Sequence, residues 1–261
     1  MTLAINNLSK TYKTRQGEIH ALQGVSLEVS EREFVSIVGP SGCGKSTLLK
    51  IVAGILAPDE GSVKFFNSND GSGFLTDLVF QEHGLFPWLN LVENVALGLK
   101  MLGVGKAARE ESARNFLDRF GLKGFYKTYP HQLSGGMKQR VALARAVVSN
   151  PSILLMDEPF GSVDAQTRVI LQEELITIWR DLRKTVLFVT HDIDEAILLS
   201  DRILVMSGRP GMILEEFTIP EGIKRQFDER FHQDVQNLKK EIWDLIRNEV
   251  RKEILVPAVA E

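Results

Sequence analysis

The sequence lacks several features that would indicate whole classes of protein. It has one cysteine, Cys43, so no disulfide can form within the chain, which fits a reducing compartment. No segment approaches the roughly 18 consecutive apolar residues that a membrane-spanning helix needs. The first ten residues lack the basic start and continuous apolar stretch of a secretory signal, so we expect none. We therefore expect a chain that is soluble by itself and meets a membrane only through a partner.

An excess of basic charge is also missing. The 31 Lys and Arg residues are outnumbered by 34 Asp and Glu residues, which gives a formal net charge of −3. A broad nucleic-acid-binding face would normally be more basic, so no nucleic-acid partner is expected. The apolar share of 44% and charged share of 25% are ordinary for a globular protein. The length of 261 residues allows one or two domains.

Short apolar runs bounded by turn residues predict buried strands at 34–38, 153–156 and 186–189. A helical pattern at 169–182 lies between the last two runs. Strand, helix and strand in this order predict a parallel α/β sheet. Farther along, Ile203–Met206 and the residues after Gly211 are spaced as a β-hairpin.

Two regions have a helical texture instead. Helix formers dominate from Gly84 to Asn150, notably at 92–102 and 107–120. In the tail, apolar side chains recur at intervals typical of an amphipathic helix, and such a helix either packs on its own domain or binds a partner. These side chains are Phe227, Phe231, Val235, Leu238, Ile242, Leu245 and Val250.

A glycine-rich loop between a predicted strand and a predicted helix matches the pattern G-x-x-x-x-G-K-[ST]. Glycines let backbone N–H groups converge on phosphate oxygens, and the following helix N-terminus favours an anion. Lys45 is expected between the β- and γ-phosphates, and Ser46 offers its hydroxyl to Mg²⁺. The alternative is a chance glycine-rich turn. The predicted ATP-binding residues are Gly39, Pro40, Ser41, Gly42, Cys43, Gly44, Lys45, Ser46 and Thr47.

Two carboxylates follow the apolar run 153–156, at the strand end where open α/β sheets bind ligands. Asp157 can hold Mg²⁺, through water, and Glu158 can act as the general base toward an attacking water. By themselves these two residues could equally form a solvated acidic turn after a core strand. The phosphate-binding loop favours the catalytic interpretation.

Between these anchors, the segment Leu133–Ala146 (LSGGMKQRVALARA) resembles the signature motif of ABC ATPases. Together with the loop and the carboxylates, four further residues follow the order of that family: an adenine-stacking aromatic, a Q-loop glutamine, a D-loop aspartate and a switch histidine. They are Tyr12, Gln81, Asp164 and His191. The resemblance covers residues 12–191, and an ordered set is far more specific than any single motif.

The resemblance implies a P-loop NTPase of the α/β class, with a RecA-like and mostly parallel sheet core, an antiparallel β portion and an inserted α-helical subdomain. The ATPase core would comprise residues 1–83 and 151–222, the helical subdomain 84–150 and the C-terminal helical tail 223–261. It also implies a homodimer, in which each ATP lies between the P-loop of one copy and the signature of the other. The signature residues are Ser134, Gly135, Gly136 and Met137.

The same resemblance assigns roles. Glu158, His191 and Lys45 would be catalytic, Tyr12 would stack on adenine, and three residues would hold Mg²⁺: Ser46, Gln81 and Asp157. Simpler interpretations remain open for single residues. Ser134 is a good helix N-cap, and His191 or Tyr12 alone could be an ordinary surface side chain. Cys43 is either a tolerated small residue or a redox-sensitive thiol.

The chain departs from the common family pattern at two positions. Met137 replaces the usual glutamine, which puts a side-chain contact there in doubt, and Val163 replaces leucine in the D-loop. Segments Gln81–Trp88 and Arg209–Gly211 resemble an import branch for nitrate, sulfonates, taurine and similar anions. A permease, a solute-binding protein and a position at the cytoplasmic face of the membrane would follow. The alternative is a soluble ABC ATPase that is not coupled to transport.

Overall fold

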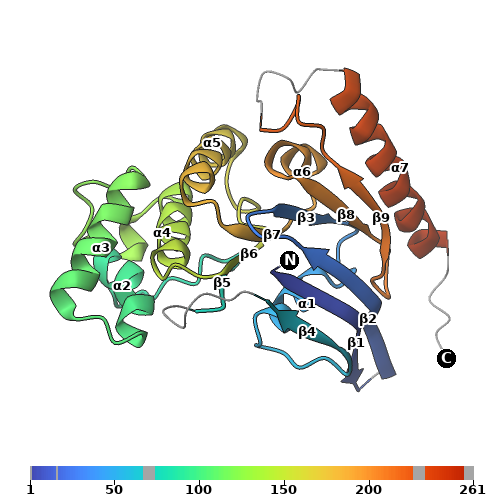
Figure 1. Cartoon of the computed structure of the whole chain (residues 1–261), viewed down its shortest axis with the longest axis horizontal. Coiled ribbons are helices and arrows are strands. Elements are labelled where there is room, and N and C mark those ends of the chain that lie inside the picture. The colour runs from blue at the N-terminus through green and yellow to red at the C-terminus, as the bar shows by residue number, and fades with distance from the viewer. Residues whose placement is uncertain (1, 16, 67–73, 226–232, 256–261) are drawn as a thin grey trace. The chain divides into compact units, whose positions relative to one another are not determined.

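The computed structural model describes residues 2–15, 17–66, 74–225 and 233–255, with side chains up to residue 252 (Figure 1). The chain divides into two compact units. Unit 1 joins residues 1–67 with 185–261, and unit 2 comprises residues 68–184. The two units are described separately below. The expected division into core, helical subdomain and tail remains a prediction.

Unit 1 contains a three-stranded antiparallel sheet in the order β2-β1-β4. The strands are β1 (Leu3–Thr14), β2 (Gly17–Val29) and β4 (Glu60–Phe65), and β1 pairs with both neighbours. Register shifts interrupt both pairings, so the burial of β1 does not alternate strictly along the strand. This sheet is the antiparallel portion expected from the sequence.

The second sheet of unit 1 runs β7-β3-β8-β9. The central strands β3 (Phe34–Val38) and β7 (Thr185–Val189) pair in parallel, and every residue of both is buried. A strand buried on both faces reads as a continuous apolar run, which is how the sequence predicted them. The strands β8 (Arg202–Met206) and β9 (Ile213–Thr218) are antiparallel and confirm the predicted hairpin.

Three helices of the described residues belong to unit 1: α1 (Lys45–Val52), α6 (Ile193–Leu199) and α7 (Gln233–Leu255). The tail helix α7 packs on its own unit, because Val235 and Ile242 join a buried cluster with residues of α6 and β8. Phe227 and Phe231, expected at the start of the amphipathic tail, lie outside the described residues.

Unit 2 contains the parallel pair β5 (Thr76–Val79) and β6 (Ile153–Asp157), together with the helices. Asn90, the N-cap of helix α2 in this unit, forms a capping box with Glu93. The helices are α2 (Leu91–Met101), α3 (Lys106–Arg119), α4 (Gly135–Val148) and α5 (Ala165–Leu182), with a short 3₁₀ turn at Pro130–Gln132.

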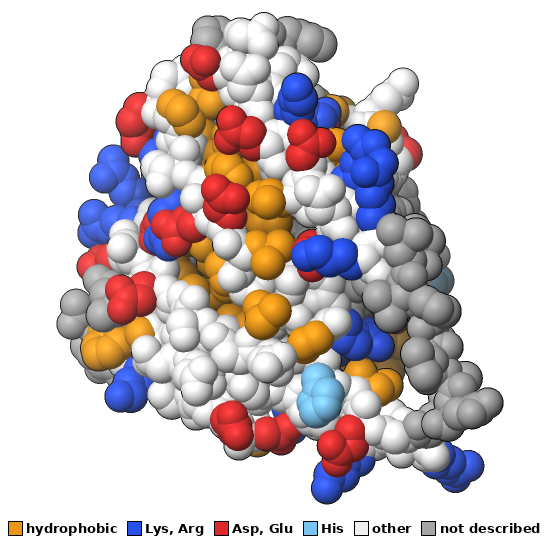
Figure 2. Space-filling model, turned by 90° about the vertical axis from the view of Figure 1, so that its right-hand side faces the viewer, with side chains coloured by type: hydrophobic (Ala, Val, Ile, Leu, Met, Phe, Trp, Pro, Cys, Tyr) orange, Lys and Arg blue, Asp and Glu red, His pale blue; other side chains and the backbone are white. Residues whose placement is uncertain are grey.

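The described residues confirm the expected α/β class with parallel and antiparallel strands. Among them, no helix combines the length and apolarity needed to span a bilayer. On the face drawn in Figure 2, a band of apolar side chains is exposed, with both acidic and basic side chains around it.

Candidate functional site

The phosphate-binding loop lies between β3 and α1, as the sequence predicts. Gly42 and Gly44 have φ angles of +79° and +108°, in the region that favours glycine. A Cβ atom on Gly44 would stand 2.6 Å from the backbone oxygen of Ala21 on β2. The loop therefore has its shape because these positions lack a side chain.

Lys45 opens α1 and turns back over the loop. Its ammonium donates hydrogen bonds to the carbonyl oxygens of Gly39 at 2.9 Å and Pro40 at 2.8 Å, and the residue is only 5% exposed. The N-cap of α1 is Gly44, which has no side chain to bind the first N–H groups of the helix. A helix N-terminus and a buried ammonium together form an environment that attracts an anion.

Cys43 is fully buried within this loop, and its Sγ lies 3.8 Å from the Lys45 ammonium. A thiol without solvent access reacts slowly with oxidants, so the packing interpretation suits it better than the redox interpretation.

His191 and Tyr12 both belong to unit 1. The parallel register joins Ile37 of β3 with Val189 of β7, so the loop after β3 and the histidine after β7 leave the same edge of the sheet. Tyr12 is 36% exposed on β1, and its hydroxyl is 3.3 Å from the Thr47 hydroxyl on α1. Unit 1 thus contains the loop, the predicted switch histidine and the predicted adenine-stacking tyrosine.

In unit 2, the two carboxylates lie at the C-terminal end of β6. Asp157 ends β6 and is 7% exposed, and the next residue, Glu158, has a φ angle of +44°. A side chain in the left-handed region is strained, and such strain concentrates at functional sites. The Gln81 amide, which follows β5, donates a hydrogen bond to Glu158 at 3.4 Å. The structure thus brings together the predicted Q-loop glutamine and the predicted general base.

The signature residues form the start of α4. Ser134 is the N-cap, and its hydroxyl accepts a hydrogen bond from the Met137 N–H at 3.3 Å. The capping interpretation is therefore correct for this side chain. Gly136 lies so close to α5 that an added Cβ would be 2.7 Å from the Thr167 methyl group. The small residues of the signature are needed for this close packing.

Asp164, the predicted D-loop aspartate, is the N-cap of α5 and accepts a hydrogen bond from the Thr167 N–H at 3.0 Å. Hydrogen bonds from the Thr167 backbone and side chain lower the pKa of this carboxyl. Because Thr167 also packs on Gly136, the D-loop and the signature share one neighbour. Helix α5 begins four residues before the predicted start at Val169, since Asp164 caps it.

Three residues that the sequence did not single out fix the segment after Gln81 to α4. The His83 ring binds the Gln139 amide oxygen at 2.8 Å, and Arg145 donates to the carbonyl oxygens of His83 at 3.0 Å and Gly84 at 2.6 Å. Burial lowers the pKa of His83. These contacts join residues about 60 positions apart, so no local pattern in the sequence could have indicated them.

Known proteins resemble the chain over most of its length. The family model for ABC transporters matches residues 22–161. An ABC transporter ATP-binding protein of Methanocaldococcus jannaschii is 45% identical over 97% of this chain and 94% of its own length. The aliphatic sulfonates import ATP-binding protein of Bacillus thuringiensis is 46% identical over 82% of this chain and 84% of its own. The nitrate import ATP-binding protein of Synechocystis is 43% identical over 84% of this chain and 83% of its own length.

A solved structure of a dimeric ATP-binding cassette in a post-hydrolysis state, bound to ADP and phosphate, is also similar. It is 36% identical, with a TM-score of 0.74, over 84% of this chain and 99% of the cassette. The sequence-based family and fold predictions are confirmed by these matches.

Proposed function

The chain belongs to the ABC transporter family as an ATP-binding, ATP-hydrolysing cassette, and from this premise we propose that it energises the import of a small anion. The observation that carries the ATP-hydrolysing part of the proposal is the paired arrangement of Gln81 and Glu158 beside the buried Asp157. A carboxylate held by an amide at the end of a parallel strand is suited to orient and deprotonate a water molecule.

ATP binding begins at the loop after β3. The backbone N–H groups at the start of α1 and the Lys45 ammonium would bind the phosphate oxygens. The ammonium now bonded to Gly39 and Pro40 carbonyls would exchange these neutral partners for charged phosphate oxygens, which form stronger hydrogen bonds. The Tyr12 ring, which is open to solvent, would stack on the adenine.

Hydrolysis would follow from in-line attack of water on the γ-phosphorus. Glu158 accepts a proton from this water as the new P–O bond forms, and ADP leaves with the electron pair of the broken bond. His191 and Lys45 stabilise the charge on the γ-phosphate oxygens. The hydroxyl of Ser46, the amide oxygen of Gln81 and the carboxylate of Asp157 are the hard oxygen donors that Mg²⁺ prefers, so these three residues would hold it. When bound, Mg²⁺ neutralises part of the phosphate charge.

A second copy would complete each site. The signature residues Ser134–Met137 form another helix N-terminus, suited to the phosphates of an ATP bound to the opposite copy. The similar cassette of known structure is dimeric, which supports a homodimer here. Closure and reopening of this dimer would drive the permease subunits.

The solute is proposed from the relatives. Sulfonate, nitrate and taurine import proteins are 43–46% identical to this chain. Import of such anions would require a separate permease and a solute-binding protein. Binding to the permease would hold this subunit at the cytoplasmic face of the membrane. The function is therefore that of the motor subunit in an anion importer.

Replacement of Glu158 by Gln tests the catalytic part of this proposal. The variant removes the base but keeps the side-chain size, so phosphate release should fall by about 10²- to 10⁴-fold while ATP still binds. The matched control is Glu173→Gln, which neutralises an exposed carboxylate on α5 and should leave the rate unchanged. A Glu158→Gln protein that hydrolyses ATP at the unaltered rate would refute the assignment of the base.

A further inference from the structure

The turn between β8 and β9 packs directly on the phosphate-binding loop. A Cβ atom on Gly211 would be 2.1 Å from the Cys43 carbonyl oxygen, so only glycine permits this approach. The same glycine exchanges backbone hydrogen bonds with β2, donating to Ala21 O and accepting from Gln23 N, both at 3.0 Å. The turn is therefore held against the loop and against β2 at once.

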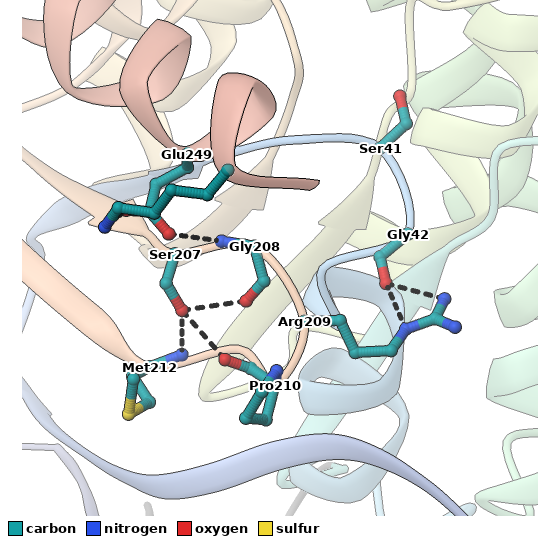
Figure 3. A pocket seen from close by; sticks show the side chains of 9 residues that line it. Ser41, Gly42, Ser207, Gly208, Arg209, Pro210, Met212 and Glu249 are labelled. Atoms are coloured by element: carbon teal, nitrogen blue, oxygen red, sulfur yellow. Dashed lines mark hydrogen bonds and ion pairs between the residues drawn. The ribbon is translucent and has the colours of Figure 1, made fainter. Parts of the chain in front are cut away.

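One side chain of this turn binds the loop itself. The Arg209 guanidinium donates to the Gly42 carbonyl oxygen from Nη2 at 3.1 Å and from Nε at 3.4 Å (Figure 3). Gly42 has a positive φ angle, so without a Cβ its peptide can turn easily, and the bonds from Arg209 oppose that turn. Arg209 draws this carbonyl toward itself, and a carbonyl held there cannot turn toward a bound phosphate and repel it.

The far side of the turn is anchored to α7. The buried Glu249 carboxylate accepts a hydrogen bond from the Gly208 N–H at 3.0 Å (Figure 3). Within the turn, the Ser207 hydroxyl donates to the Pro210 carbonyl and accepts from the Met212 N–H. Burial alone would raise the pKa of Glu249, but hydrogen bonds from Lys252 and Gly208 outweigh it and lower that pKa, so the carboxylate is charged at neutral pH.

Space beside Arg209 makes its contact depend on the turn. The turn, Ser41, Gly42, Glu249 and Lys252 line an open cavity of about 570 Å³. The Arg209 guanidinium borders this cavity, so a shift of the backbone that carries it has room to draw it away from Gly42. Glu249 holds this backbone at Gly208, the residue before Arg209.

We propose that Arg209 is a positioning residue for the phosphate-binding loop, and that Glu249 positions Arg209, so that the docking of α7 sets the affinity for ATP. This inference rests on the proposed ATP-binding role of the loop. It gives the tail helix a function in nucleotide binding, because α7 contacts the turn and the turn contacts the phosphate-binding loop.

The test is the dependence of phosphate release on ATP concentration in the full-length protein. Arg209→Ala should raise the KM for ATP about tenfold, the size expected for losing a hydrogen bond to a charged group, while kcat stays within about twofold. Arg209→Lys, which keeps the charge and one donor, should recover part of the affinity. A KM that does not change in Arg209→Ala, or an equal loss confined to kcat, would overturn the inference.

A second set of variants tests the role of Glu249. Glu249→Ala should raise the KM in the same direction, and adding it to Arg209→Ala should raise it no further, because both act through one contact. Glu241→Ala, at an exposed position of the same helix, is the matched control and should change nothing. If the two effects multiply instead, Glu249 does not act through Arg209.

A third variant separates this inference from the function beneath it. Lys45→Ala should abolish the binding of radiolabelled ATP. If it binds ATP normally, the proposed function itself fails. If Lys45→Ala loses ATP while both Arg209→Ala and Glu249→Ala bind it normally in a folded protein, checked by thermal unfolding, only the positioning role is wrong.

Discussion

Two helix N-termini of this chain are rich in glycine, and they are built differently. At α1 the cap is Gly44, and the neighbouring Lys45 is buried on the carbonyls of its own loop. At α4 the cap is Ser134, whose hydroxyl accepts a hydrogen bond from the Met137 N–H. The first end has no side-chain cap for its N–H groups, whereas the second is capped by its own serine.

This difference suits the two helix ends to different roles in binding ATP. An end without a side-chain cap and with a buried ammonium can bind phosphate by itself. An end capped by serine has less to gain from an anion, so it suits a contact that forms only when another copy presents its nucleotide. We therefore expect the P-loop to provide the affinity for ATP and the signature to make hydrolysis depend on a second copy.

The strongest way to break this comparison is Gly44→Ala. The added methyl would be strained at a φ of +108° and would meet Ala21 O at 2.6 Å. Left-handed strain of about 1–2 kcal/mol per residue and the displaced loop should weaken ATP binding by roughly 100-fold or more. Equilibrium binding of labelled ATP measures this, with Gly105→Ala as control, since a Cβ there meets nothing within 4 Å.

Gly136→Ala addresses the other helix end. Its methyl would overlap the Thr167 methyl group, and overpacking of about 1–3 kcal/mol should shift the start of α4. Hydrolysis should fall at least about tenfold, whereas ATP binding to dilute, monomeric protein should stay normal. If binding by the monomer fell as far as it does in Gly44→Ala, the two ends would not have separate roles.

Tyr12 tests how much of the affinity lies outside the phosphates. Tyr12→Ala should raise the KM for ATP roughly fivefold, because base stacking contributes about 1 kcal/mol at its weaker limit. Tyr12→Phe keeps the ring and loses only the hydroxyl near Thr47, so its KM should stay close to the original. Equal losses in both variants would show that the hydroxyl matters and that stacking does not.

Asp77 on β5 gives the smallest effect on activity and a clear effect on stability. Burial raises its pKa to about 6 despite a hydrogen bond from Ser149. The folded protein therefore holds this proton more tightly than the unfolded chain, and the resulting stability is lost as the pH rises through about 6.

At pH 8 the neutral variant Asp77→Asn should thus unfold at higher denaturant concentration than the original, because its free energy of unfolding is larger by up to about 3 kcal/mol. The free energies of unfolding of the two proteins should converge near pH 4. Urea unfolding at both pH values measures this. A variant that is less stable at pH 8 would contradict the burial argument.

The buried strands next to the motifs could be predicted from the sequence. Strands β3, β6 and β7 are apolar on both faces and bounded by turns, so their positions followed from pattern alone. The long strands β1 and β2 did not stand out, because register shifts break the alternation of buried and exposed residues. The start of α5 was placed too late, although Asp164 is a strong N-cap signal.

The contacts that organise the site could not be predicted. Arg209 binds Gly42 across 167 positions, and Glu249 binds Gly208 across 41. Such pairs depend on which strands are neighbours in a sheet, and local residue patterns do not carry that information. Motifs identified the chemistry, and topology determined which side chains support it.

The claim that two chains share each nucleotide is tested most directly by crosslinking. One preparation carries Ser41→Cys and another Ser134→Cys, both with Cys43→Ser and Glu158→Gln, and the two are mixed with a short bifunctional thiol reagent. The account predicts a crosslinked dimer that forms with ATP and not without it. No crosslink in the presence of ATP, together with full ATP hydrolysis by a strictly monomeric protein, would contradict it.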